Sequence, residues 1–128
     1  MVLPPLLSEH PRALQTFLAV ILPAAYGAVC GYYLGVSETT YLVLSVIGVL
    51  GGIGAGFDHL GPAPGAKRGI VAGSLFGAGI LIAHEIHGAE AEADLPDPAV
   101  LLVVVTTALA VVFGALGGWL RQRAEPAR

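Results

Sequence analysis

The sequence predicts an all-α integral membrane protein with four transmembrane helices. Hydrophobic residues make up 55% of its 128 residues and charged residues only 12%, whereas soluble domains carry about 25% charged residues. The charges are also unevenly placed. Glu38 is the only charged residue from Leu14 to Phe57, and there is none from Ala99 to Leu120. A soluble domain of this length needs polar groups over most of its surface, so we exclude that class.

Four apolar segments are long enough to be spanning helices, since about 20 residues cross the hydrocarbon core of a bilayer. They cover about residues 14–35, 40–57, 68–87 and 98–120. Polar or helix-breaking stretches separate them at Ser37 and Glu38, at the Gly/Pro run 61–65, and at residues 88–98. Long apolar runs without strict alternation favour helices over a barrel. Pro23 lies inside the first span and should free the carbonyl group of Ala19, so we expect a kink there.

The signs of the charges predict the orientation. With four spans, one side of the membrane holds all six basic residues of the chain: Arg12, Lys67, Arg68, Arg121, Arg123 and Arg128. The other side holds only acidic residues: Glu38, Glu85, Glu90, Glu92, Asp94 and Asp97. Lys and Arg mark the cytoplasmic side. We therefore expect a multi-pass protein of the plasma or inner membrane with both termini in the cytoplasm. Its parts are an N-terminal interfacial segment (1–13), a transmembrane domain (14–121) and a cytoplasmic tail (122–128).

Most of the 18 glycines lie within the spans and are spaced four apart, so each row lies along one helix face. Small residues let two helix backbones approach closely in lipid, which predicts glycine-mediated helix packing. The rows could pack the helices of one subunit, or they could form contacts between subunits or line a narrow pore. The second interpretation predicts a homo-oligomer. The residues are Gly27, Gly31, Gly35, Gly48, Gly52, Gly56, Gly69, Gly73, Gly77, Gly114 and Gly118.

The end of the third span carries the most unusual polar segment. His84 and His87 are three residues apart and share a helix face, with Glu85 between them. Two imidazoles so placed could bind a divalent metal, with a carboxylate from a loop completing the shell. They could also titrate in the physiological pH range. The alternative is a helix end whose polar groups simply meet water and lipid headgroups.

The loop after the third span carries four carboxylates, from Glu90, Glu92, Asp94 and Asp97. Repeated around an oligomer, they would form an acidic mouth that concentrates cations. In a single copy they would be an ordinary solvated loop. At the opposite side of the membrane, Asp58 and His59 face Lys67 and Arg68 across a short loop, where we expect a local ion pair.

The sequence contains no catalytic motif, cofactor-binding motif or nucleic-acid signature. We therefore expect no enzymatic activity, no nucleic-acid partner, and no cofactor apart from a metal at His84 and His87. Between the interfaces Tyr26 and Cys30 are the only ionisable residues expected, which argues against a proton-coupled carrier. We expect a small homo-oligomeric channel that prefers cations. The alternatives are a non-conducting scaffold or accessory subunit of a larger membrane complex, or a small ion or metal carrier.

Overall fold

A computed structural model describes residues 3–125, and every regular element in this range is helical. Four stretches are long and apolar enough to cross a membrane: Arg12–Leu34, Glu38–Gly56, Pro62–His87 and Leu101–Ala124. This agrees with the predicted all-helical fold with four spans and marks the chain as a multi-pass membrane protein. In order, the elements are η1 (Leu7–Glu9), α1 (Arg12–Thr16), the π-helical η2 (Phe17–Ile21), α2 (Leu22–Leu34), α3 (Glu38–Gly56), α4 (Pro62–His87) and α5 (Leu101–Ala124).

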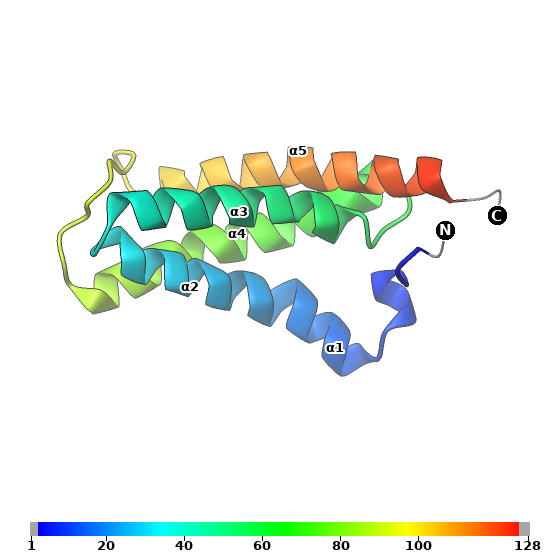
Figure 1. Cartoon of the computed structure of the whole chain (residues 1–128), viewed down its shortest axis with the longest axis horizontal. Coiled ribbons are helices and arrows are strands. Elements are labelled where there is room, and N and C mark those ends of the chain that lie inside the picture. The colour runs from blue at the N-terminus through cyan, green and yellow to red at the C-terminus, as the bar shows by residue number, and fades with distance from the viewer. Residues whose placement is uncertain (1–2, 126–128) are drawn as a thin grey trace.

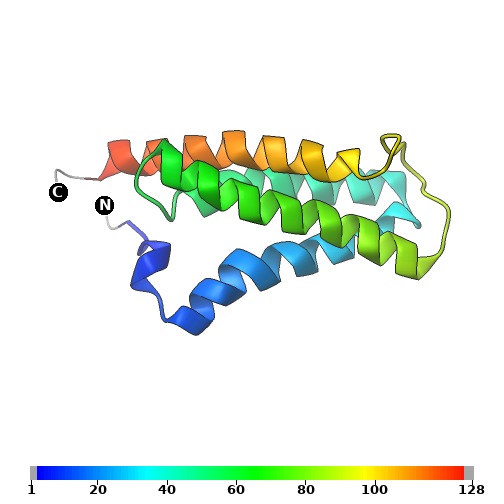
Figure 2. The same ribbon diagram turned by 180° about the vertical axis from the view of Figure 1, so that it is seen from behind.

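The long helices lie side by side as an elongated bundle (Figures 1 and 2). Residues 3–12, the turn 57–61 and residues 121–125 lie at one end, which we call the basic end. The turn 35–37 and the loop 88–100 lie at the other, the acidic end. At the basic end the first span diverges from the rest of the bundle, and η1 turns back toward it (Figure 1).

Three helix pairs approach until backbone meets backbone. Between α4 and α5, a Cβ added at Gly65 would collide with the carbonyl oxygen of Gly114, and one at Gly114 with that of Gly65. In the same way, a Cβ at Gly27 of α2 would meet the Phe76 carbonyl of α4. A Cβ at Gly117 of α5 would meet the Ile53 carbonyl of α3. The helices are thus joined in the order α2, α4, α5, α3.

The pair α2 and α3 also packs together, and here the contact is made through side chains. A Cβ at Gly48 of α3 would contact the rings of Tyr26 and Phe76 rather than backbone. These rings are stacked with centroids 5.8 Å apart, and the Tyr26 hydroxyl donates to the Leu44 carbonyl at 2.6 Å. Toward the acidic end, α2, α3 and α4 enclose the buried core of Cys30, Leu34, Tyr41, Phe76 and Ile80.

α4 begins at Pro62, earlier than the segment expected from about residue 68. The sequence predicts a loop over the Gly/Pro run 61–65, but residues 62–65 belong to the helix. Proline is favoured in the first helical turn because the N–H it lacks has no helical partner there. Gly61, with φ of 102°, provides the turn that precedes the helix. Arg68 consequently lies about 9 Å along the helix from its start, at a rise of 1.5 Å per residue.

The expectation that Pro23 frees the carbonyl of Ala19 needs correction. The turn before Pro23 is a π-helix, in which each N–H bonds the carbonyl five residues earlier. The Leu22 N–H accordingly donates to the Phe17 carbonyl. In this register the missing N–H of Pro23 frees the carbonyl of Leu18, and that carbonyl accepts a hydrogen bond from Arg68 at 3.2 Å.

Candidate functional site

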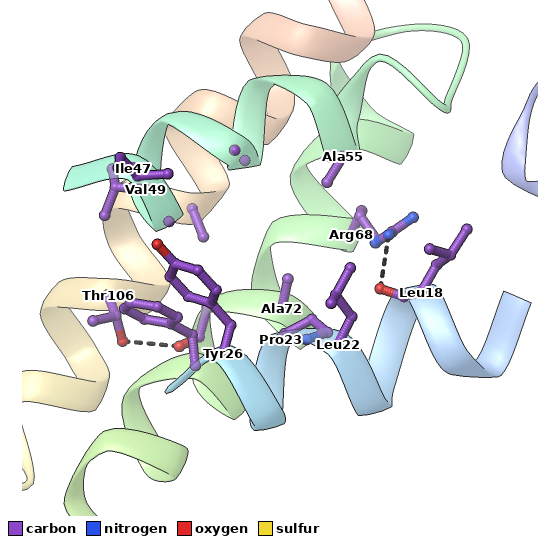
Figure 3. A pocket seen from close by; sticks show the side chains of 16 residues that line it. Leu18, Leu22, Pro23, Tyr26, Ile47, Val49, Ala55, Arg68, Ala72 and Thr106 are labelled. Carbon is purple, nitrogen blue, oxygen red and sulfur yellow. Dashed lines mark hydrogen bonds between the residues drawn. The ribbon is translucent and has the colours of Figure 1, made fainter. Parts of the chain in front are cut away.

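An apolar pocket of about 370 Å³ lies in the part of the bundle nearer the basic end. η2 and α2 form one wall, α3 forms the facing wall, and α4 with a small part of α5 lies behind (Figure 3). Its lining is almost entirely aliphatic, aromatic or glycine, as in Leu22, Ile47, Ala72 and Phe76. Such a space suits the apolar part of a ligand.

The pocket exists because two neighbouring walls fail to meet. On one side, the π turn and Pro23 interrupt the regular helix where the first span diverges. On the other side, α3 presents Gly48, Gly51 and Gly52 to the space. At Gly51 no described atom lies within 4 Å of the position that a Cβ would take. Bare backbone therefore borders a gap that side chains would otherwise fill.

Arg68 lies at one end of this pocket, and its side chain extends toward Leu18 (Figure 3). The residue is only 8% exposed. Its Nη2 donates to the Leu18 carbonyl at 3.2 Å, and its Nη1 lies 3.3 Å from His59 Nε2. Its Nε is buried and has no hydrogen-bond partner within residues 3–125. A buried cation is costly unless it is paired. Arg68 forms no ion pair with any of residues 3–125.

The ion pair expected between residues 58–59 and 67–68 is not formed within the described residues, and a hydrogen bond between Arg68 and His59 is found instead. Arginine can only donate, so His59 Nε2 accepts the hydrogen bond and the imidazole is neutral. Burial lowers the pKa of His59 below its ordinary value of 6.5, and the neighbouring Arg68 charge lowers that pKa further. Asp58 has the opposite, smaller effect on the same pKa. The site therefore carries the positive charge of Arg68 beside a neutral acceptor.

Arg121 is the second buried arginine of the bundle, and unlike Arg68 it has a carboxylate partner among residues 3–125. It is 2% exposed. Its Nε donates to Glu125 Oε1 at 2.8 Å, and its Nη1 donates to the Phe57 carbonyl at 3.0 Å. The guanidinium also lies 5.2 Å from the centre of the Phe57 ring. Arg121 thus ties the end of α3 to α5 and has a carboxylate partner, which Arg68 lacks.

The predicted histidine site lies at the acidic end, away from the pocket. His84 is partly buried, and its Nδ1 has no partner among the described residues. The His87 ring packs on Tyr32 with centroids 4.6 Å apart, and Glu85 is exposed. Within residues 3–125 no group of three or more His, Cys, Asp or Glu side chains is placed to hold a metal ion. A metal at His84 and His87 stays a prediction.

The four loop carboxylates, Glu90, Glu92, Asp94 and Asp97, are all exposed at the acidic end. The loop itself is attached to the bundle, because the Glu92 N–H donates to the Leu34 carbonyl at 2.7 Å. Leu95 also packs against the buried core. The carboxylates therefore face solvent from an anchored backbone, and none of them lines the pocket.

The predicted glycine rows fall into two groups. A Cβ would collide with backbone or side-chain atoms of another element at most of these positions: Gly27, Gly31, Gly35, Gly48, Gly56, Gly69, Gly73, Gly77, Gly114 and Gly118. At Gly52 the nearest described atom is the Phe113 Cβ at 3.5 Å, which is an ordinary contact. Gly51 and Gly54 were not in the predicted rows and have open surroundings.

Sequence reasoning missed Arg68 as a site residue because it placed the start of the third span at this residue. The signal was present in the Gly-Pro-Ala-Pro-Gly run, since a proline at the first helical position would have moved the helix start to Pro62. When compared with known proteins, the chain matches no family model, no curated protein and no solved structure.

Proposed function

We propose that this protein binds a small amphiphilic anion within the cytoplasmic half of the membrane. One observation carries the proposal: an apolar pocket is bordered by the buried guanidinium of Arg68, which has an unpartnered Nε and no carboxylate partner among residues 3–125. The pocket would hold the apolar part of the ligand, and Arg68 would hold its anionic group.

The charge distribution supports this location. Lys and Arg favour the cytoplasmic side, so the basic end and both termini are proposed to lie there. Arg68 lies about 9 Å along α4 from its start. The anionic group of a molecule in the cytoplasmic leaflet could reach that depth while its chain stays among apolar side chains.

The chemistry of the site also limits the ligand. Guanidinium groups bind carboxylate, phosphate and sulfonate oxygens through charge-assisted hydrogen bonds. The pocket, at about 370 Å³, is near the lower limit of ligand sites, which span roughly 300–1,000 Å³. A molecule with one short chain fits this volume better than a two-chain phospholipid.

Binding can be measured with the purified protein in phosphatidylcholine nanodiscs and a medium-chain alkyl sulfonate as the probe. An alkyl trimethylammonium of equal chain length tests whether charge sign matters. We expect Arg68→Gln to weaken sulfonate binding about tenfold or more, as for a lost hydrogen bond to a charged group. The neighbouring exposed Lys67 is the matched control, and Lys67→Gln should change binding less than twofold.

A second variant addresses the pocket itself. Gly51→Leu places a side chain where no described atom lies within 4 Å, so it should fold and yet occupy the space. It should weaken binding of the sulfonate while Arg68 remains. Equal affinity for the cationic and anionic probes, or full binding by both Arg68→Gln and Gly51→Leu, would overturn the proposal.

A second candidate function is the cation-preferring homo-oligomeric channel. It is supported by the exposure of Glu38, Glu85, Glu90, Glu92, Asp94 and Asp97 at one end of the bundle. Glycine-mediated packing within each subunit is part of this proposal. Gly51 and Gly54, on the open face of α3, would then be available to a second copy.

Cation flux into liposomes, together with the oligomeric state, tests this second function. The variant with Glu90, Glu92, Asp94 and Asp97 all replaced by Gln or Asn should lose cation preference. Absence of flux from well-folded protein would favour the non-conducting accessory subunit instead.

A further inference from the structure

The hydrogen bond between Arg68 and His59 depends on the protonation state of the histidine. Arg68 Nη1 lies 3.3 Å from His59 Nε2, and a guanidinium has no lone pair to accept with. Nε2 must therefore be the acceptor, and the ring proton is on Nδ1. Protonation of Nε2 would remove the acceptor and place a second positive charge beside the first.

The surroundings keep His59 neutral while the pocket is empty. Burial of the imidazole and the Arg68 charge lower its pKa below 6.5, and Asp58 partly offsets them. The elements packed around the turn 57–61 carry further titratable groups. These are Glu9 and His10 near η1, and Arg121 with Glu125 on α5. Because Glu125 balances Arg121, Arg68 is the cation that acts most directly on His59.

An anion held by Arg68 would reverse this balance. Its oxygens would accept from the guanidinium, and its negative charge would offset the positive charge that disfavours imidazolium. We infer that binding of an anion at Arg68 is coupled to uptake of one proton by His59. This inference rests on the proposed function, since it requires the pocket to bind an anion.

The coupling has a defined stoichiometry. The proton comes from water and bonds to His59 Nε2, and no bond of the ligand is broken. A singly charged anion and one proton add no net charge to the protein. By linkage, a site that takes up a proton with its ligand binds that ligand more tightly as the pH falls. Full coupling to one proton changes the dissociation constant tenfold per pH unit.

The test uses the alkyl sulfonate probe, because a sulfonate stays ionised between about pH 5 and pH 8, where histidine titrates. We expect the wild-type affinity in nanodiscs to increase as the pH falls through this range. His59→Gln keeps an amide oxygen that can accept from Arg68 but cannot titrate, so its affinity should not change with pH. The control His10→Gln removes another histidine at the same end of the bundle and should keep the wild-type slope.

Proton uptake can also be measured directly in the wild-type protein with a pH indicator in weakly buffered solution. The NMR titration of the His59 ring should show a higher pKa with sulfonate than without it. These two measurements need no variant to fold. A wild-type affinity that does not change with pH, or a slope that persists in His59→Gln, overturns the coupling alone. If the wild type does not bind sulfonate at any pH, the proposed function fails with it.

Discussion

Glycine has opposite effects in two regions of the bundle: it permits close contact between α4 and α5, and it leaves space between the first span and α3. Along α4 and α5, Gly65 and Gly114 each face a carbonyl of the other helix, so neither position has room for a Cβ. Along α3, Gly51 faces open space. A glycine lets two backbones touch only where the opposite helix stays close. Toward its N-terminal end, through the π turn and α1, the first span diverges from α3 (Figure 1), and there the same lack of a side chain leaves a pocket.

The two buried arginines differ in the same way. Arg121 is surrounded by partners, including a carboxylate, and connects α3 to α5. Arg68 has a carbonyl and a neutral imidazole, and one nitrogen left over. A structural arginine in a membrane protein is expected to be fully paired, because an uncompensated buried charge is costly. Because Arg68 keeps an unpartnered nitrogen and Arg121 has a carboxylate partner, Arg68 is the candidate for ligand binding and Arg121 is not.

The largest effect on stability should come from adding a side chain at the close contact between α4 and α5. Gly65→Val places its Cβ against the Gly114 carbonyl and should lower the free energy of unfolding by about 3 kcal/mol or more. Gly54→Val is the control, because it changes helix propensity equally but has no described atom within 4 Å of its Cβ. Thermal unfolding in detergent compares the two variants. Equal destabilisation by both would show that the close approach does not stabilise the bundle.

Replacement of Arg121, the buried arginine with a carboxylate partner, should have the next largest effect on stability. Arg121→Gln loses the bonds to Glu125 and to the Phe57 carbonyl, at a cost of about 2 kcal/mol in unfolding free energy. The guanidinium of its exposed neighbour Arg123 lies 5.2 Å from the centre of the Trp119 ring and makes no hydrogen bond or ion pair within residues 3–125. Arg123→Gln should therefore cost less than about 1 kcal/mol. If denaturant unfolding gave the reverse order, Arg121 would not be the link between α3 and α5.

The four spans were predictable because composition and charge placement act over whole segments. The uncharged run from Ala99 to Leu120, for example, can only be buried in lipid or in protein. The pocket was not predictable from the sequence. A π turn changes which carbonyl Pro23 frees, and no local pattern distinguishes it from an α-helix. The sequence also could not show that the backbone opposite Gly51 would be absent while the one opposite Gly65 would be present.

The link between Pro23 and Arg68 can be measured with a double-mutant cycle. Arg68→Gln should destabilise the wild-type protein, because the Leu18 carbonyl accepts from Arg68. Pro23→Ala restores an N–H that can satisfy the freed carbonyl, so the cost of Arg68→Gln should fall by about 1 kcal/mol in that background. Pro62→Ala is the matched control, because a proline at the first helical position frees no carbonyl. Additive effects of Pro23→Ala and Arg68→Gln would mean that the two residues are not coupled.

The smallest effect should be a dependence of stability on pH. It should arise from His59, which contacts Arg68, and should not depend on Arg121. The pKa of His59 is lower in the folded protein than its ordinary value of 6.5. Its contribution to stability is therefore fully present above pH 6.5 and is lost as the pH falls through the folded-state pKa. Because His59 is only partly buried, the loss should stay below about 1 kcal/mol.

Melting temperatures of the ligand-free protein, measured from neutral pH downward, should show this decline in the wild type. The decline should persist in Arg121→Gln and should be smaller in His59→Gln, where the acceptor for Arg68 no longer titrates. Acidic residues also lose charge at lower pH, so the comparison depends on the difference between these variants rather than on the slope of any one. An identical decline in all three proteins would show that the imidazole does not interact with Arg68 differently in its two protonation states.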